Sequence, residues 1–236
     1  MKLNFKAERV LAVTAHPDDA ELLCAGTLAR VKEEGGAIAI CVLCQGDKGQ
    51  SSTPVKNLAA MRRAEMTNAA QLLGAKLFTG EFFDGELTDG PKQRAKLMEI
   101  YRQFNPTLVL AHYPNDYHPD HRAASALAEA ASWFCASRGQ KTKTKPMTVP
   151  PAVWWMDTVN MSGFDPGIYV NMAEHFAIKQ RMLLCHHSQL SRGQDGDFSP
   201  LGELMRLQCT ARGAQSGAPA AEAFRVHNVF KRARAW

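Results

Sequence analysis

Residues 9–44 read RVLAVTAHPDDAELLCAGTLARVKEEGGAIAICVLC, and this stretch decides the fold class. Its two ends, residues 9–15 and 37–44, are short apolar runs typical of buried strands. Between them, leucine, alanine and valine recur at helical spacing from residue 18 to residue 34, and Gly35-Gly36 ends the predicted helix. A strand, a helix and a second strand in this order predict a right-handed crossover between parallel strands.

The same alternation continues beyond residue 44. Further strands are predicted at 76–79, 107–112 and 153–159, and further helices at 57–73, 91–104, 118–136, 174–186 and 201–212, with glycine- and alanine-rich turns after the last. This pattern predicts an α/β fold: a single domain with a Rossmann-like, mostly parallel sheet and helices on both faces. We expect residues 1–190 to form its core and residues 191–236 to form a C-terminal extension packed on the same domain.

The composition is that of an ordinary globular protein and excludes several classes. The 236 residues are 45% hydrophobic and 22% charged, and no apolar run approaches the roughly 20 residues of a membrane-spanning helix. The N-terminus lacks the apolar core and cleavage site of a signal peptide, so we expect a soluble, cytoplasmic protein. The net charge is +5, but the basic runs at 141–145 and 231–234 carry no interleaved aromatic residues, which argues against nucleic-acid binding.

Six cysteines raise the question of a zinc site, because Cys41 and Cys44 have CxxC spacing. Both lie on a predicted strand, where side chains three residues apart face opposite sides. No second CxxC is present to complete four ligands. We interpret the cysteines as buried thiols in a reducing compartment.

Two polar clusters follow predicted strands: His-Pro-Asp-Asp-Ala-Glu at 16–21 and His-Pro-Asp-His at 118–121. Ligands of parallel α/β sheets bind beyond the carboxyl ends of the strands, so we expect the functional site just after residues 15, 44 and 113. Two histidines and a carboxylate with one open position are a frequent arrangement for catalytic zinc. The plainer alternative is that Asp18 only caps the helix that follows it.

Together these motifs resemble the LmbE-like, or PIG-L, family of zinc-dependent N-acetylglucosaminyl deacetylases. The resemblance extends over residues 9–190 and includes several shorter motifs. These are Gly26-Thr-Leu, Arg62-Arg-Ala-Glu65, Asn105-Pro-Thr-Leu-Val, and Lys179 followed by His186-His-Ser-Gln189.

The resemblance implies a catalytic zinc ion held by His16, Asp19 and His121. It implies that Asp18 is the general base that converts zinc-bound water into hydroxide. It also implies that His118 stabilises the oxyanion or protonates the leaving amine. Zinc can lower the pKa of a bound water molecule to about 7, so such a hydroxide is available at neutral pH.

Four further residues complete the expected site. By the resemblance, Asp120 orients a neighbouring histidine, Arg62 contacts the sugar or acyl end, and His186 lines the site. Tyr117 precedes His118 on the predicted loop and could hydrogen-bond the substrate or the oxyanion.

Less specific expectations concern the rim of the site. Trp154 and Trp155 are adjacent on a predicted strand, so one must face the core while the other could stack on a sugar. The polar loop 137–151 is expected to be mobile near the pocket. Asp84 could bond a sugar hydroxyl or could simply shape its turn.

The leading hypothesis is a zinc-dependent hydrolase of carbon–nitrogen bonds in linear amides. Its partner would be a small N-acetylated sugar or glycoconjugate, from which it removes the acetyl group of an N-acetylglucosamine unit. The alternatives are hydrolysis of another N-acyl amide or a phosphoester, and a sugar- or nucleotide-binding module without turnover. Asp18 favours the enzyme, because a module needs no free carboxylate beside a metal ligand. A sheet edge or the C-terminal tail could build a homo-oligomer, although the sequence does not require one.

Overall fold

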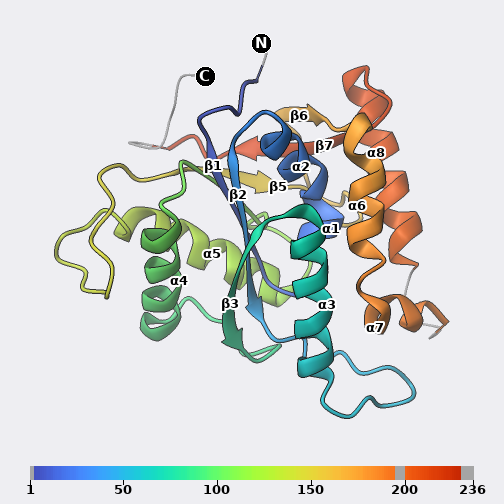
Figure 1. Ribbon diagram of the computed structural model, residues 1–236, viewed down its shortest axis with the longest axis horizontal. Helices are drawn as coiled ribbons and strands as arrows, with labels where there is room; N and C mark the ends of the chain where they lie inside the picture. The colour runs from blue at the N-terminus through green and yellow to red at the C-terminus, as the bar shows by residue number, and fades with distance from the viewer. Residues whose placement is uncertain (1–2, 195–199, 230–236) are drawn as a thin grey trace.

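A seven-stranded sheet organises the chain, and its first five strands run parallel (Figure 1). The computed structural model describes residues 3–194 and 200–229. The strands are β1 (Arg9–Thr14), β2 (Ala37–Cys44), β3 (Lys76–Phe82), β4 (Leu108–Ala111), β5 (Ala152–Met156), β6 (Ile168–Asn171) and β7 (Ala221–Val226). Their order is β3-β2-β1-β4-β5-β7-β6, and β7 is antiparallel to both of its neighbours. The predicted single-domain, mostly parallel α/β sheet is confirmed.

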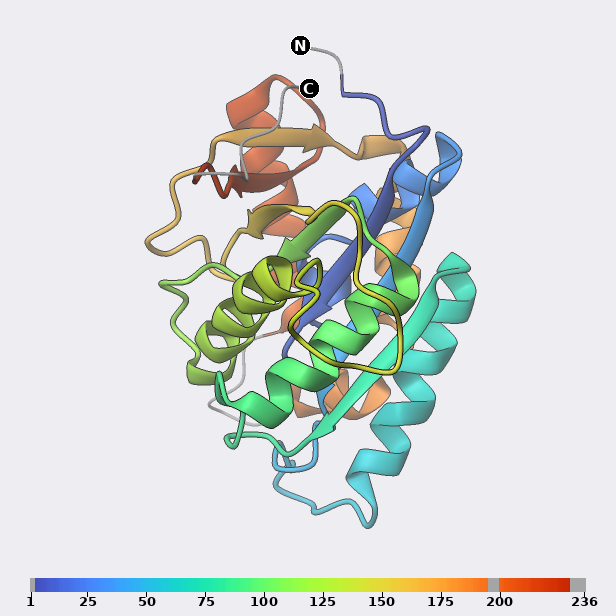
Figure 2. The ribbon, with the colours of Figure 1, turned by 90° about the vertical axis from the view of Figure 1, so that its left-hand side faces the viewer.

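Helices cover both faces of this sheet, as predicted. One face packs against α1 (Asp19–Leu23), α2 (Ala25–Glu33), α3 (Leu58–Leu73), α6 (Phe176–Leu183) and α8 (Leu201–Ser216). The other face packs against α4 (Pro91–Phe104) and α5 (Pro119–Phe134), which lie in front of the sheet in Figure 2. Short helical turns, namely η1 (Ala173–His175), α7 (His187–Leu190) and η2 (Ser191–Gln194), complete the described elements.

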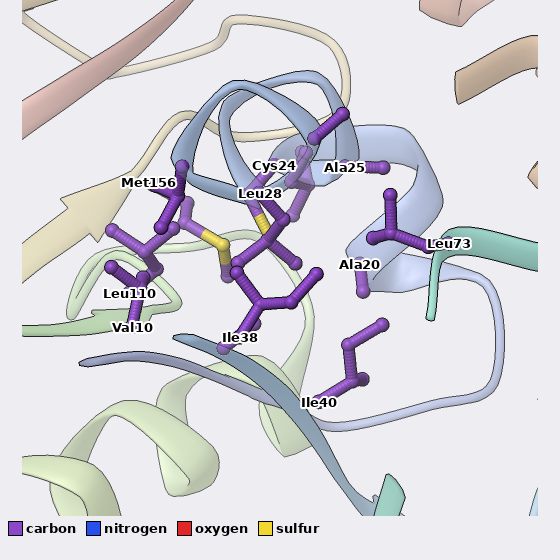
Figure 3. Close-up of a cluster of buried hydrophobic side chains, with 14 of the residues drawn as sticks. Val10, Ala20, Cys24, Ala25, Leu28, Ile38, Ile40, Leu73, Leu110 and Met156 are labelled. Atoms are coloured by element: carbon purple, nitrogen blue, oxygen red, sulfur yellow. The ribbon is translucent and has the colours of Figure 1, made fainter. Parts of the chain in front are cut away.

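Two apolar layers form the core because the parallel strands are buried on both faces. In the first layer, shown in Figure 3, Val10, Ile38 and Leu110 of the sheet meet Cys24 and Leu28 of the α1–α2 segment. The second layer lies under α4 and α5. Within residues 3–194 and 200–229, no helix has the length and hydropathy that crossing a membrane requires.

Both tryptophans of β5 are buried, so neither offers a surface on which a sugar could stack. Trp154 is 0% exposed in the first layer, and Trp155 is 4% exposed in the second. The strand has a helix layer on each side, which sequence alternation alone did not show.

The segment after α8 is a strand, not the predicted run of turns. Gly217 ends α8 with a φ of 71°, and residues 221–226 then enter the sheet between β5 and β6. Trp154 is paired with Val226 on one side, and Ile168 with Phe224 on the other. The division at residue 190 stays a prediction, and the basic run at 231–234 lies outside the described residues.

The single helix predicted from residue 18 to residue 34 is broken at Cys24, whose φ and ψ are −148° and 3°. Glu222 of β7 accepts hydrogen bonds from the amides of Gly26 (2.9 Å) and Thr27 (2.7 Å), which begin α2. Lys179 of α6 pairs with Glu222 at 2.5 Å and donates to the carbonyl of Leu22 at 2.8 Å, where α1 ends. The break at Cys24 creates one more helix end and one more helix start. Their backbone carbonyl and amide groups are hydrogen-bonded by Lys179 and Glu222, which are distant in the sequence.

Removing the charge of Glu222 is expected to destabilise the fold strongly. Glu222→Gln leaves the fully buried ammonium of Lys179 without its counter-charge, which should lower the free energy of unfolding by about 3–5 kcal/mol. Urea denaturation measures this loss. Glu33→Gln is the matched control, because the Glu33 side chain is 65% exposed and its pair with His175 should contribute no more than about 1 kcal/mol. Equal stabilities of the two variants would contradict the proposed role of Glu222.

Five of the six cysteines are buried and free, and Cys185 is partly exposed. The expectation that Cys41 and Cys44 face opposite sides was wrong, because both lie in the layer under α4 and α5. The register between β2 and β3 shifts between Val42 and Cys44, and such a bulge re-aims the side chains that follow it.

Loop 137–151 lies at the amino-terminal edge of the sheet, so its predicted place near the pocket was wrong. It leads directly into β5, whose first amide donates to the carbonyl of Thr107 just before β4. Arg102 of α4 holds the loop by donating to Thr142 at 2.8 Å and to the carbonyl of Ser137 at 2.9 Å. The lysines at 141, 143 and 145 are exposed, as expected of a solvated loop.

Glu99 of α4 holds this loop through hydrogen bonds that require its carboxylate to be ionised. Although desolvation raises the pKa of the Glu99 carboxyl, hydrogen bonds from the Thr144 hydroxyl and amide lower it to about 2. A folded-state pKa below the unfolded value gives stability above about pH 4.5 that is lost as the pH falls toward 2. We expect Glu99→Gln to reduce this loss in denaturation curves measured across that range. Glu203→Gln, at an exposed position of α8, should leave the pH dependence unchanged.

Candidate active site

A cavity of about 520 Å³ opens where β1 and β4 end, at the point where the strand order reverses. Open α/β sheets bind ligands at such a switch point. Eight of the nine predicted site residues line this cavity: His16, Asp18, Asp19, Arg62, Tyr117, His118, Asp120 and His121. His186 is fully buried and lies outside the lining.

Nitrogen and oxygen donors converge at the base of the cavity. His121 Nε2 lies 3.3 Å from Asp19 Oδ1, and His16 Nδ1 lies 3.7 Å from Asp19 Oδ2. His16 and His121 also belong to one group of donors within 4.8 Å of one another, which His118 completes. A second such group joins Asp19 and His121 to His112. The described residues thus contain a His/Asp cluster that could hold a metal ion.

Each of the two histidines is oriented by a carboxylate behind it. His16 Nε2 lies 2.9 Å from Asp120 Oδ2, so a proton on Nε2 leaves Nδ1 facing Asp19. His121 Nδ1 lies 3.0 Å from Asp116 Oδ1, so a proton there leaves Nε2 facing Asp19. Metal-binding histidines commonly use their second nitrogen in this way. Asp120 is placed as its predicted role requires, whereas Asp116 was missed because no motif includes it.

Charges in the cluster are arranged to favour a cation. Although burial alone would lower it, the carboxylates of Asp19 and Asp116 raise the pKa of His121 to about 10. Burial would raise the pKa of Asp19, but His121 and His112 hold it well below its usual range. His112 is fully buried, and its Nε2 lies 3.1 Å from Asp19 Oδ2 and 3.0 Å from the amide nitrogen of Ala15, so this histidine lies directly against Asp19.

Asp116→Asn tests whether the Asp116 carboxylate orients His121 for metal binding. The amide keeps the size of the side chain but can no longer fix the imidazole of His121 through a charged hydrogen bond. Losing such a partner typically weakens metal binding about 10–100-fold, and we expect a loss in this range. Titration of the metal-free protein with zinc against a competing chelator measures it. An affinity equal to that of the unaltered chain would exclude Asp116 as the orienting group.

Asp18 begins α1 in a left-handed backbone conformation, with φ at 98°. Its carboxylate is buried, and Oδ2 accepts a hydrogen bond from Gln189 Nε2 at 3.1 Å. Burial, and then the adjacent Asp19 carboxylate, raise the pKa of Asp18 to about 7. A side chain that exchanges a proton near neutral pH is suited to general acid–base chemistry. The side chain accepts none of the amide hydrogen bonds of α1, which goes against the alternative of a simple cap.

His118 presents a proton to the cavity. Its Nδ1 accepts a hydrogen bond from the Asp120 amide at 3.1 Å, so the neutral ring carries its proton on Nε2. Burial, and then the nearby His16, lower the pKa of His118 below its ordinary value. The ring packs edge-on against His16, with centroids 4.8 Å apart. At neutral pH, His118 is therefore placed as a neutral hydrogen-bond donor.

Arg62 is an organiser of the cavity wall. It is 2% exposed and donates to the carbonyls of Gly46 and Gly49, each at 2.7 Å, and to Gln189 Oε1. Gln189 in turn contacts Asp18, so Arg62 reaches that carboxylate through one side chain. Glu65 of the same helix accepts from the Ser188 amide and hydroxyl. The two motifs around Arg62 and Ser188, far apart in the sequence, are thus interlocked.

The positions of Tyr117, His186 and Asp84 relative to the cavity differ. Tyr117 is 57% exposed at the rim, with its ring centroid 5.8 Å from that of His121. His186 lies 3.4 Å from Glu21, behind Asp18. Asp84 lines the cavity and accepts from the amides of Gly46 (2.8 Å) and Lys48 (3.2 Å), so it shapes the loop as a turn residue would. Lys48, Val159, Arg192 and Leu201 also line the cavity and were not predicted.

Known proteins are similar to this chain in sequence and in fold. The PIG-L family, described as GlcNAc-PI de-N-acetylase, matches residues 11–132. The chain is 32% identical over 158 residues to 4-oxalmesaconate hydratase of Pseudomonas putida, covering 63% of this chain and 61% of that protein. It is 28% identical over 196 residues to 1D-myo-inositol 2-acetamido-2-deoxy-alpha-D-glucopyranoside deacetylase of Rhodococcus erythropolis, covering 70% of this chain and 66% of that one. The matched segments thus span less than two thirds of the length of either relative.

A solved structure extends the likeness over nearly the whole chain. The N,N'-diacetylchitobiose deacetylase from Pyrococcus horikoshii superposes with a TM-score of 0.82 at 25% identity. The superposition covers 94% of this chain and 85% of that one.

Proposed function

Because this chain belongs to the PIG-L family, we propose that it is a zinc-dependent hydrolase that removes the N-acetyl group from an N-acetylglucosamine-type sugar or conjugate. One observation carries the proposal. Asp18, whose pKa is raised to about 7, lies in the same cavity as a His/Asp cluster whose histidines are oriented by carboxylates. The named activities of the Rhodococcus and Pyrococcus proteins support the substrate class.

The donor set of the chain fits zinc. We assign His16 Nδ1, Asp19 and His121 Nε2 as the ligands, since each histidine has its other nitrogen against a carboxylate. Two histidines and one carboxylate leave a position open for water or substrate. When bound, zinc would act as a Lewis acid that makes water more acidic and polarises the amide carbonyl.

Asp18 is assigned as the general base. Its raised pKa lets it take a proton from the attacking water near neutral pH and pass that proton on. Gln189 holds the carboxylate in place, and Arg62 fixes Gln189, so the base is oriented by two motifs of the chain.

His118 is assigned to the other side of the reaction. A neutral imidazole with its proton on Nε2 can donate to the oxygen of the amide as negative charge develops there. It can also give a proton to the departing amine. Tyr117, exposed beside it, is assigned to substrate contact, and Arg62 to shaping the wall that the sugar meets. His186 is assigned to positioning Glu21 and Asp18 rather than to direct contact.

A hydratase is the second candidate, because the Pseudomonas relative that carries that name is 32% identical to this chain. A base and a proton donor on either side of a metal could also add water to a carbon–carbon double bond. The two reactions differ in product, since only amide hydrolysis releases a primary amine.

The test is to measure primary-amine release from a panel of N-acetylglucosamine conjugates, with and without a zinc chelator. We expect release that the chelator abolishes and that added zinc restores. In parallel, loss of the ultraviolet absorbance of unsaturated tricarboxylates such as 4-oxalmesaconate reports hydration. Metal-dependent hydration without amine release would replace the deacetylase by the hydratase. Neither reaction from protein that carries zinc would leave another N-acyl amide or a binding module as the function.

A further inference from the structure

Cys44, His16 and Asp120 bring a sulfur, a nitrogen and an oxygen donor together beside the candidate active site. One atom of each lies within 4.8 Å of the others. His16 Nε2 and Asp120 Oδ2 are 2.9 Å apart, close to the roughly 3.3 Å that separates two ligands of a tetrahedral zinc ion. We propose that these three residues form a second, inhibitory site for a thiophilic divalent cation such as zinc.

The thiol of Cys44 is otherwise unused. It is 2% exposed, and in the part of the chain that the structure describes it makes no hydrogen bond and no disulfide. The bulge at the end of β2 turns it toward the layer that contains Ala15, and its own amide donates to the Ala15 carbonyl at 2.8 Å. Ala15 directly precedes His16, so the end of β2 brings the thiol within 4.8 Å of a ring nitrogen of His16. Soft thiolate together with imidazole is a donor pair that zinc prefers.

A cation can reach this position from the cavity, because His16 and Asp120 both line it. There the cation would take the place of the proton between His16 Nε2 and Asp120. Binding replaces the thiol proton of Cys44, which is released, and transfers the His16 proton from Nε2 to Nδ1. His16 Nδ1 then has no lone pair for the catalytic ion.

The second site therefore competes with the first for one histidine. This consequence rests on the proposed function, since it requires His16 to hold the catalytic ion. It predicts that excess zinc or cobalt lowers activity, and that the loss coincides with formation of a metal–sulfur bond.

The experiment uses cobalt as the probe, because cobalt bound to a thiolate gives an intense charge-transfer absorption in the near ultraviolet. In the unaltered protein, we expect this absorption to grow beyond the first equivalent of cobalt, together with the loss of amine release. Cys44→Ser should lack the absorption and should need at least about tenfold more cobalt for the same inhibition. Cys41→Ser is the matched control, because that buried thiol of the same strand belongs to none of the donor groups found among the described residues.

Each outcome decides the matter. Absorption that persists in Cys44→Ser, or that is absent from the unaltered protein at inhibiting concentrations, would overturn the site. The absorption does not depend on turnover, so it remains informative if no amine is released. Equal inhibition of the unaltered protein and Cys44→Ser would also overturn the proposal, because excess metal would then inhibit without Cys44.

Discussion

Asp18→Asn is expected to lower kcat by about 10²–10⁴-fold while leaving the zinc content unchanged. The amide has nearly the shape of the carboxylate, and asparagine tolerates the left-handed backbone that this position adopts. It can still contact Gln189, yet it cannot accept the proton of the attacking water. The loss should therefore fall on the chemical step and not on folding or metal binding. Steady-state amine release and metal analysis of the same preparation measure both quantities.

Asp47→Asn is the control for this variant. Asp47 is a carboxylate on the neighbouring loop that accepts from the Asp84 amide at 3.0 Å, and it does not line the cavity. Its substitution should change kcat far less than that of Asp18. A kcat within tenfold of the unaltered value in Asp18→Asn would remove Asp18 as the base.

His121→Ala is expected to abolish zinc binding and, with it, activity. The substitution removes the Nε2 donor closest to Asp19 Oδ1 and leaves two of the three assigned ligands. It also leaves the Asp116 carboxylate without its imidazole partner. Metal analysis of the purified variant should find little zinc, and added zinc should not restore amine release.

The matched control is His175→Ala. His175 belongs to η1 and lies 3.2 Å from Glu33, away from the cavity lining. This variant should retain zinc and activity. Unchanged zinc content in His121→Ala would exclude His121 as a ligand.

The sequence by itself determined the parallel core of the sheet and the place of the site. The apolar runs at residues 9–15 and 37–44 and the helical pattern between them are local signals. The periodicity of a strand or a helix can be recognised within a short window of neighbouring residues. The polar motifs at 16–21 and 118–121 each follow a predicted parallel strand, so both were expected at the carboxyl-terminal edge of the sheet, where the structure places them in one cavity.

The tertiary structure alone decided the features that depend on distant partners. The break at Cys24 needs Glu222 and Lys179, whose positions about 200 and 155 residues later no local pattern encodes. Strand β7 forms because β5 and β6 offer it two unpaired edges, and its own six residues give only a weak signal. The support of His121 by Asp116 likewise depends on how α5 begins.

The orientation of Asp18 shows the same limit within the active site. Its type and position were readable from the motif, but its proton affinity comes from burial and from Asp19, and its orientation from Gln189. Residue identity is fixed by the sequence, whereas desolvation and hydrogen-bond geometry arise only when segments far apart in the chain are packed together.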